Sequence, residues 1–122
     1  QVILMGKTPV YYSPDLLIVN GKVRIGEIKT TSMSSKVGIE GPKFSKYHSQ
    51  AMLYCYFEEI PDARFYALFL RGDYKFMKKG ADRNDDGFPE LHVYNVSYSA
   101  RELQDNYQTH FEFAKKARMI QV

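Results

Sequence analysis

The chain has 122 residues and a formal net charge of +3, which fits one domain with one hydrophobic core and permits a nucleic-acid partner without requiring one. Its 44% hydrophobic and 25% charged residues exclude an intrinsically disordered chain, and no apolar run approaches the ~18 residues of a membrane-spanning helix. The single cysteine, Cys55, excludes a disulfide framework and metal sites built on several cysteines, so we expect a cytoplasmic protein. Because no long apolar run is present, we expect no membrane partner.

Apolar and β-branched segments predict strands in the first quarter of the chain. The expected strands are residues 2–5, 9–13 (an extension of the first after a bend), 15–19 and 22–30. The last two are joined by Asn20-Gly21, which is the strongest short-range signal for a β-hairpin. Because Leu16–Val19 is apolar at every position, we expect that strand to be covered on both faces.

Helix signals appear in the rest of the chain. Pro42 suits the first turn of a helix that ends near Glu59, and Ser99 with Glu102 forms a capping box that opens a second helix. The expected elements are a helix over 41–59, strands over 63–70 and 91–96, and a helix from residue 99. The order β-β-β-α-β-β-α predicts one α/β domain, with a mixed sheet and helices packed on it.

Three charged residues near the hairpin predict a site that binds a divalent metal ion. Glu27 and Lys29 are two residues apart on one strand, so their side chains point to the same face, and Asp15 comes from the neighbouring strand. Carboxylates that converge in this way suit Mg²⁺, or Mn²⁺ in its place. Glu27 and Lys29 alone could equally form a surface ion pair, and Asp15 could be an ordinary turn residue.

These residues carry a resemblance to a known family. Pro14-Asp15, followed by Glu27-x-Lys29 on the next strand, resembles the signature of the PD-(D/E)XK nuclease superfamily. Gln50-x-x-x-Tyr54 on the following helix resembles a motif of its RecB-like and lambda-exonuclease-like branch. The resemblance implies a restriction-endonuclease-like α-β-β-β-α-β core, of which the N-terminal helix is not evident here.

The resemblance also implies an activity, namely metal-dependent hydrolysis of DNA phosphodiester bonds. It assigns Asp15, Glu27 and the carbonyl of Ile28 as Mg²⁺ ligands and Lys29 as the group that activates water. The same resemblance gives Gln50 and Tyr54 the role of positioning the phosphate, although Tyr54 could instead belong to a core stripe with Gln50 solvated. An exonuclease-like role in DNA recombination, repair or phage DNA processing is what we expect.

Alternatives remain open at this point. A structure-selective endonuclease of the junction-resolvase type, or a non-catalytic nucleic-acid-binding module on the same fold, would share these motifs. The branch usually places a Glu or His upstream of the Asp, and nothing upstream of Asp15 is Glu, Asp or His. A preceding segment, a homo-oligomer or a partner protein could complete the site, and we expect the isolated chain to bind metal weakly.

Basic and aromatic residues interleave in two segments that suit either a phosphate-tracking groove or a solvated face. The expected nucleic-acid contacts are Lys43, Lys46, Tyr47, Lys75 and Lys78. Residues 82–87 resemble the first half of a calcium loop, but Val93 stands where a bidentate Glu is needed, so we expect a solvated loop instead.

Overall fold

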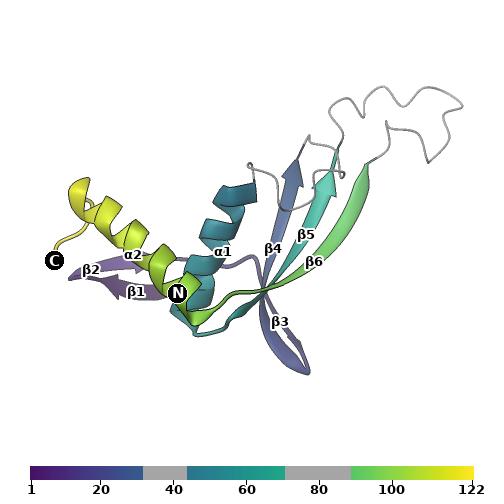
Figure 1. Ribbon diagram of the computed structural model, residues 1–122, viewed down its shortest axis with the longest axis horizontal. Helices are drawn as coiled ribbons and strands as arrows, with labels where there is room; N and C mark the ends of the chain where they lie inside the picture. The colour runs from purple at the N-terminus through teal and green to yellow at the C-terminus, as the bar shows by residue number, and fades with distance from the viewer. Residues whose placement is uncertain (32–43, 71–88) are drawn as a thin grey trace, which may run out of the picture.

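The computed structural model describes residues 1–31, 44–70 and 89–122 (Figure 1). Its elements are β1 (Val2–Met5), β2 (Thr8–Tyr11), β3 (Leu16–Asn20), β4 (Lys22–Thr31), α1 (Ser45–Glu58), β5 (Asp62–Phe69), β6 (Glu90–Ser97) and α2 (Ala100–Lys116). The α/β class is confirmed, while the predicted beginning of the first helix at 41–43 lies outside the described residues. In the part of the chain that the structure describes, neither helix has the length and apolar composition that crossing a bilayer would take.

Four strands form a mixed sheet in the order β3-β4-β5-β6. β3 and β4 are an antiparallel hairpin, β5 runs parallel to β4 after the α1 crossover, and β6 is antiparallel to β5. β1 and β2 form a separate antiparallel pair. The prediction that the second segment extends the first strand is therefore wrong, because Gly6, at a φ of 63°, lets the chain turn back on itself.

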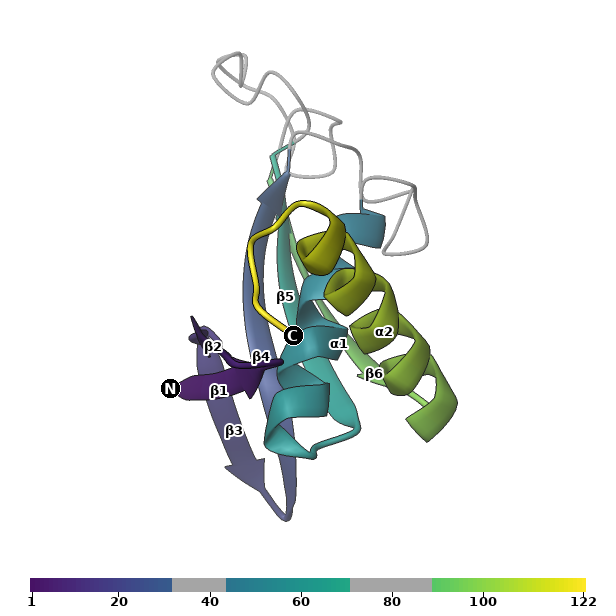
Figure 2. The same ribbon diagram turned by 90° about the vertical axis from the view of Figure 1, so that its left-hand side faces the viewer.

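The helices lie on one side of the four-stranded sheet in two layers. α1 packs against the sheet and α2 packs against α1 (Figure 2). The core lies between the sheet and the helices. Its buried side chains come from the sheet, α1, α2 and the link to α2, namely Ile25, Ala51, Cys55, Ala63, Phe65, Tyr98 and Leu103, with a second cluster of Phe44, Ala67 and Phe69. Cys55 is thus a small core residue, and burial raises the pKa of its thiol to about 12.

Strand β3 is not covered on both faces, so that prediction is wrong. It lies at the edge of the sheet, and the exposed fractions of Leu17 and Val19 are 58% and 72%. No described helix covers the opposite face of the sheet, where Ile28 and Leu91 are 54% and 64% exposed. An apolar run indicates a strand, but its neighbours in the sheet decide whether it is buried.

The capping box at the beginning of α2 is confirmed. The Ser99 hydroxyl accepts a hydrogen bond from the backbone N–H of Glu102, whose carboxylate accepts one from the backbone N–H of Ser99. Five residues after Glu102, Tyr107 stacks on Tyr56 of α1 with ring centroids 4.3 Å apart. α1 ends at Glu58, and its C-cap residue Glu59 takes a left-handed conformation two residues before Pro61. The Tyr56–Tyr107 stack fixes α2 on α1, the helix that carries the predicted active-site residues Gln50 and Tyr54.

Candidate active site

The register of the β3–β4 hairpin places Asp15 and Glu27 directly opposite each other on neighbouring strands. Val19 pairs with Val23 and Leu16 with Gly26, so the next position along each strand places Asp15 opposite Glu27. Gly21, at a φ of 68°, provides the left-handed residue of the turn. Directly opposed residues share a face of the sheet, so the hairpin has the register that the predicted site requires.

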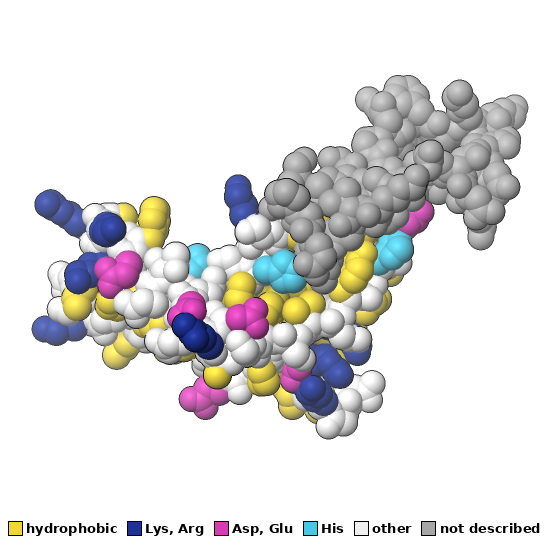
Figure 3. Space-filling view, viewed as in Figure 1, with side chains coloured by type: hydrophobic (Ala, Val, Ile, Leu, Met, Phe, Trp, Pro, Cys, Tyr) yellow, Lys and Arg dark blue, Asp and Glu magenta, His cyan; other side chains and the backbone are white. Residues whose placement is uncertain are grey.

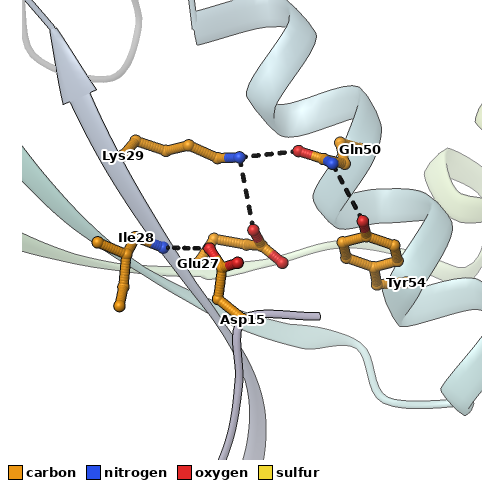
Figure 4. A network of polar contacts seen from close by, with 6 residues as sticks. All are labelled: Asp15, Glu27, Ile28, Lys29, Gln50 and Tyr54. Atoms are coloured by element: carbon orange, nitrogen blue, oxygen red, sulfur yellow. Dashed lines mark hydrogen bonds and ion pairs between the residues drawn. The ribbon is translucent and has the colours of Figure 1, made fainter. Parts of the chain in front are cut away.

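Asp15 lies immediately before β3, and its carboxylate binds the backbone of the neighbouring strand β4. Its Oδ2 accepts a hydrogen bond of 2.9 Å from the backbone N–H of Ile28 (Figure 4). In the same register the residue opposite Ile28 is Pro14, which has no N–H to continue the ladder. The N–H and C=O of one strand residue point to the same edge, so the Ile28 carbonyl is directed toward the edge where Asp15 lies.

Glu27 is a buried carboxylate beside a second acidic group. Its side chain lies on the α1 face of the sheet and the residue is 1% exposed. Among the described residues Oε1 has no hydrogen-bond partner, while Oε2 lies 3.5 Å from Lys29 Nζ. Burial, followed by the negative charge of Asp15, raises the pKa of Glu27 to about 7, and Lys29 opposes this shift. An orphaned carboxylate oxygen beside a second carboxylate is a ready acceptor for a cation.

Lys29 links the strand to the helix. Its ammonium donates a hydrogen bond of 2.8 Å to Gln50 Oε1, and Gln50 Nε2 donates one of 3.0 Å to the hydroxyl of Tyr54 (Figure 4). The same ammonium lies 4.9 Å from the ring centroid of Tyr47, a cation–π arrangement. Gln50 and Tyr54 are four residues apart on one face of α1 and therefore reach this network together.

The Tyr54 hydroxyl remains protonated in this setting. Burial raises its pKa, the hydrogen bond from Gln50 lowers it, and the charges of Glu27 and Asp15 raise it further. Because the hydroxyl oxygen accepts the bond from Gln50, its own proton remains available for donation.

Tyr12 is a part of the site that sequence reasoning missed. Its ring stacks on Tyr54 with centroids 6.0 Å apart and lies 4.9 Å from Phe57. Its hydroxyl donates a hydrogen bond of 2.8 Å to Glu58. Tyr12 therefore attaches the segment before Asp15 to α1. An aromatic residue three positions before the Asp is a weak signal, because only the structure shows which helix it meets.

The residues predicted to contact nucleic acid do not gather at one place among the described residues. Lys46 is exposed on α1, whereas Tyr47 is half-buried and packs edge-on against Phe44, with centroids 5.0 Å apart. Tyr47 thus packs in the core and also contacts the ammonium of Lys29. The remaining predicted contacts and the calcium-like segment lie outside the described residues, namely Lys43, Lys75, Lys78 and residues 82–87.

The donors at the site are oxygen atoms. Within the described ranges no three His, Cys, Asp or Glu side chains gather at one place, so the set here is two carboxylates and one backbone carbonyl. Hard oxygen donors of this kind suit Mg²⁺ or Mn²⁺, which keep several waters when few protein ligands are present.

Comparison with known protein families gives no matching family model, and no characterised protein or solved structure is significantly similar to the chain. Function is therefore inferred from the residues and geometry of the site.

Proposed function

We propose that this chain is a metal-dependent deoxyribonuclease domain of the RecB-like PD-(D/E)XK type, with an exonuclease-like activity on DNA. The observation that carries the proposal is the level placement of Asp15 and Glu27 on one face of the β3–β4 hairpin, with the ammonium of Lys29 beside them. A chance ion pair between Glu27 and Lys29 would not require a buried carboxylate with a free oxygen.

The topology supports the same proposal. The hairpin β3–β4, the crossover helix α1 and the parallel strand β5 follow one another in the order of the strand–strand–helix–strand part of the nuclease core. The two acidic residues come from the hairpin and the polar pair, Gln50 and Tyr54, comes from the crossover helix, as the resemblance implies. The further strand β6 and helix α2 extend this unit on one side.

The residues present fit a divalent cation. Asp15, Glu27 and the carbonyl of Ile28 would hold it, and the free Oε1 of Glu27 is the structural reason for this assignment. When bound, Mg²⁺ would polarise the scissile phosphate and lower the pKa of a coordinated water.

Lys29 is the cationic group that the chain itself supplies. Gln50 holds its ammonium by a hydrogen bond, and the ring of Tyr47 lies against it, so its position is fixed before substrate binds. In this position it can orient the attacking water and stabilise negative charge on the phosphate. Tyr54, which keeps its proton, can donate a hydrogen bond to a phosphate oxygen.

Cleavage of end-labelled linear DNA tests the proposal. The wild-type chain should cleave in Mg²⁺ and not in EDTA, and Lys29→Met should reduce the rate by about 100-fold or more because the charge is removed at nearly constant volume. Arg101→Met is the matched control, since its partner Asp105 is exposed and the ion pair is long, at 3.9 Å. Cleavage by Lys29→Met at the wild-type rate would exclude the proposed role.

Covalently closed circular DNA distinguishes the alternatives within the proposal. An exonuclease leaves intact circles uncut, whereas an endonuclease of the junction-resolvase type nicks or cuts its preferred structure. Binding of DNA without cleavage in both Mg²⁺ and Mn²⁺ would instead indicate the non-catalytic module.

A further inference from the structure

The turn between β1 and β2 contacts the C-terminal residues of the chain away from the active site. The backbone N–H of Lys7 donates a hydrogen bond of 2.7 Å to the carbonyl of Gln121, and the N–H of Gln121 donates one of 2.8 Å to the hydroxyl of Thr8. The contact is close, since a Cβ added to Gly6 would lie 2.3 Å from the Gln121 carbonyl oxygen. The turn between β1 and β2 therefore holds the segment that follows α2.

This contact gathers positive charge from two distant parts of the sequence. Lys7 lies in the turn, and Arg118 is three residues before Gln121, within a chain reach of about 11 Å. With Lys115 and Lys116 they form what we call the basic arm, and all four side chains are exposed. Figure 3 shows Lys and Arg side chains gathered at the end of the molecule where α2 ends, on the left of the view.

Neutralisation within the chain does not explain this arrangement. Among the described residues no member of the basic arm has a carboxylate within ion-pair distance. The nearest acidic residue in sequence, Glu112, accepts a hydrogen bond of 3.1 Å from Gln108. Lys115 and Lys116 alone would be explained by the negative end of the helix dipole, but Lys7 belongs to another segment.

We propose that the basic arm binds the phosphate backbone of the DNA substrate outside the segment that is cleaved. This proposal rests on the proposed nuclease function for the identity of the polyanion. Like charges held together by backbone contacts favour a polyanionic partner, because each neutralised phosphate releases condensed counterions. The arm projects away from the four-stranded sheet that carries the site (Figure 1). It would therefore contact phosphates of long DNA at a distance from the site, independently of base sequence.

Salt-dependent binding in EDTA tests the proposal without cleavage. The arm variant Lys7→Gln/Lys115→Gln/Lys116→Gln and the control Arg24→Gln/Arg64→Gln/Arg101→Gln lose the same net charge from different surfaces. Fluorescence anisotropy with a duplex of about 30 base pairs gives the slope of log Kd against log salt for each protein. Each lost phosphate contact reduces that slope by about 0.9, so the slope of the arm variant should be lower than that of the wild type by roughly 2 to 3. The control should keep the wild-type slope.

The outcomes separate this inference from the proposed function. An arm variant with the wild-type slope, or a control that loses as much, would overturn the inference. An arm variant that binds vesicles of anionic lipid less well while binding DNA as the wild type does would also overturn it. Absence of Mg²⁺-dependent cleavage by the wild-type chain would contradict the nuclease function, whereas the slopes would still decide whether the arm binds DNA.

Discussion

Asp15 lies opposite Glu27 because the β3–β4 hairpin turns through an odd number of residues centred on Gly21. A tight two-residue turn of the kind that Asn20-Gly21 favours would shift the register by one position and place the carboxylates on opposite faces of the sheet. The site therefore depends on the conformation of this turn, although the turn is several residues away from it.

The first prediction concerns Gly21. Its φ is 68°, and an added Cβ would have nothing within 4 Å, so any cost of substitution is conformational. Gly21→Ala should lower the free energy of unfolding by about 1 kcal/mol, whereas Gly21→Asn should cost much less because Asn tolerates the left-handed region. Urea denaturation measures both variants, and equal effects of Ala and Asn would show that the turn is not held in this conformation.

The second prediction is a dependence of stability on pH in EDTA. The folded pKa of Glu27 is raised from 4.5 to about 7, mainly by burial. The folded state therefore holds the proton more tightly than the unfolded state does. Stabilisation by the protonated carboxyl should be full below pH 4.5 and should be lost as the pH rises through 7, amounting to about 3 kcal/mol.

Glu27→Gln is the control for this dependence, because it keeps the shape and cannot ionise. The difference in unfolding free energy between wild type and variant should change across this pH window and level off above it, with the variant the more stable protein at pH 8. Parallel pH curves for the two proteins would contradict the raised pKa.

The third prediction separates Gln50 from an ordinary surface residue. Gln50→Ala removes the hydrogen bond that holds the Lys29 ammonium, so kcat for DNA cleavage should fall by about tenfold with little change in KM. Gln108→Ala is the matched control, since Gln108 makes a comparable exposed bond to Glu112 on α2. A larger effect of Gln108→Ala on kcat would contradict the role of Gln50.

The fourth prediction concerns Tyr12, which we expect to position Asp15 through its contacts with α1. Tyr12→Phe loses the bond to Glu58 but keeps both ring contacts, and it should cost about 1 kcal/mol of stability with Mg²⁺ affinity unchanged. Tyr12→Ala also loses the contacts with Tyr54 and Phe57, and its apparent Mg²⁺ affinity in cleavage should fall about tenfold. Equal Mg²⁺ affinities for the two variants would leave Tyr12 a purely structural residue.

Much of the fold could be predicted from local signals. Apolar runs gave the strands, Ser99 with Glu102 gave the beginning of α2, and Pro61 follows the end of α1 closely. These signals act within a few residues, so the sequence displays them directly. The alternation of side chains along a strand likewise predicted that Glu27 and Lys29 share one face.

The errors and omissions concern contacts between distant segments. The exposure of Leu17 and Val19 follows from the edge position of β3, which depends on which strands pair. The return of β2 onto β1 and the stacking of Tyr12 on Tyr54 are likewise tertiary results. The place of Gln50 beside Lys29 came only from the family resemblance, because no periodicity relates the strand of Lys29 to α1. Packing between elements is what local patterns omit.

The most direct test of the central claim is to locate Mn²⁺ in crystals of the chain grown with a short DNA duplex. We predict an anomalous scattering peak in contact with both Asp15 and Glu27, and its loss in Glu27→Gln. Crystals without DNA should show a weaker peak, because phosphate oxygens complete the coordination. A DNA complex in Mn²⁺ with no peak between Asp15 and Glu27, or with the same peak in Glu27→Gln, would contradict a metal site at this hairpin.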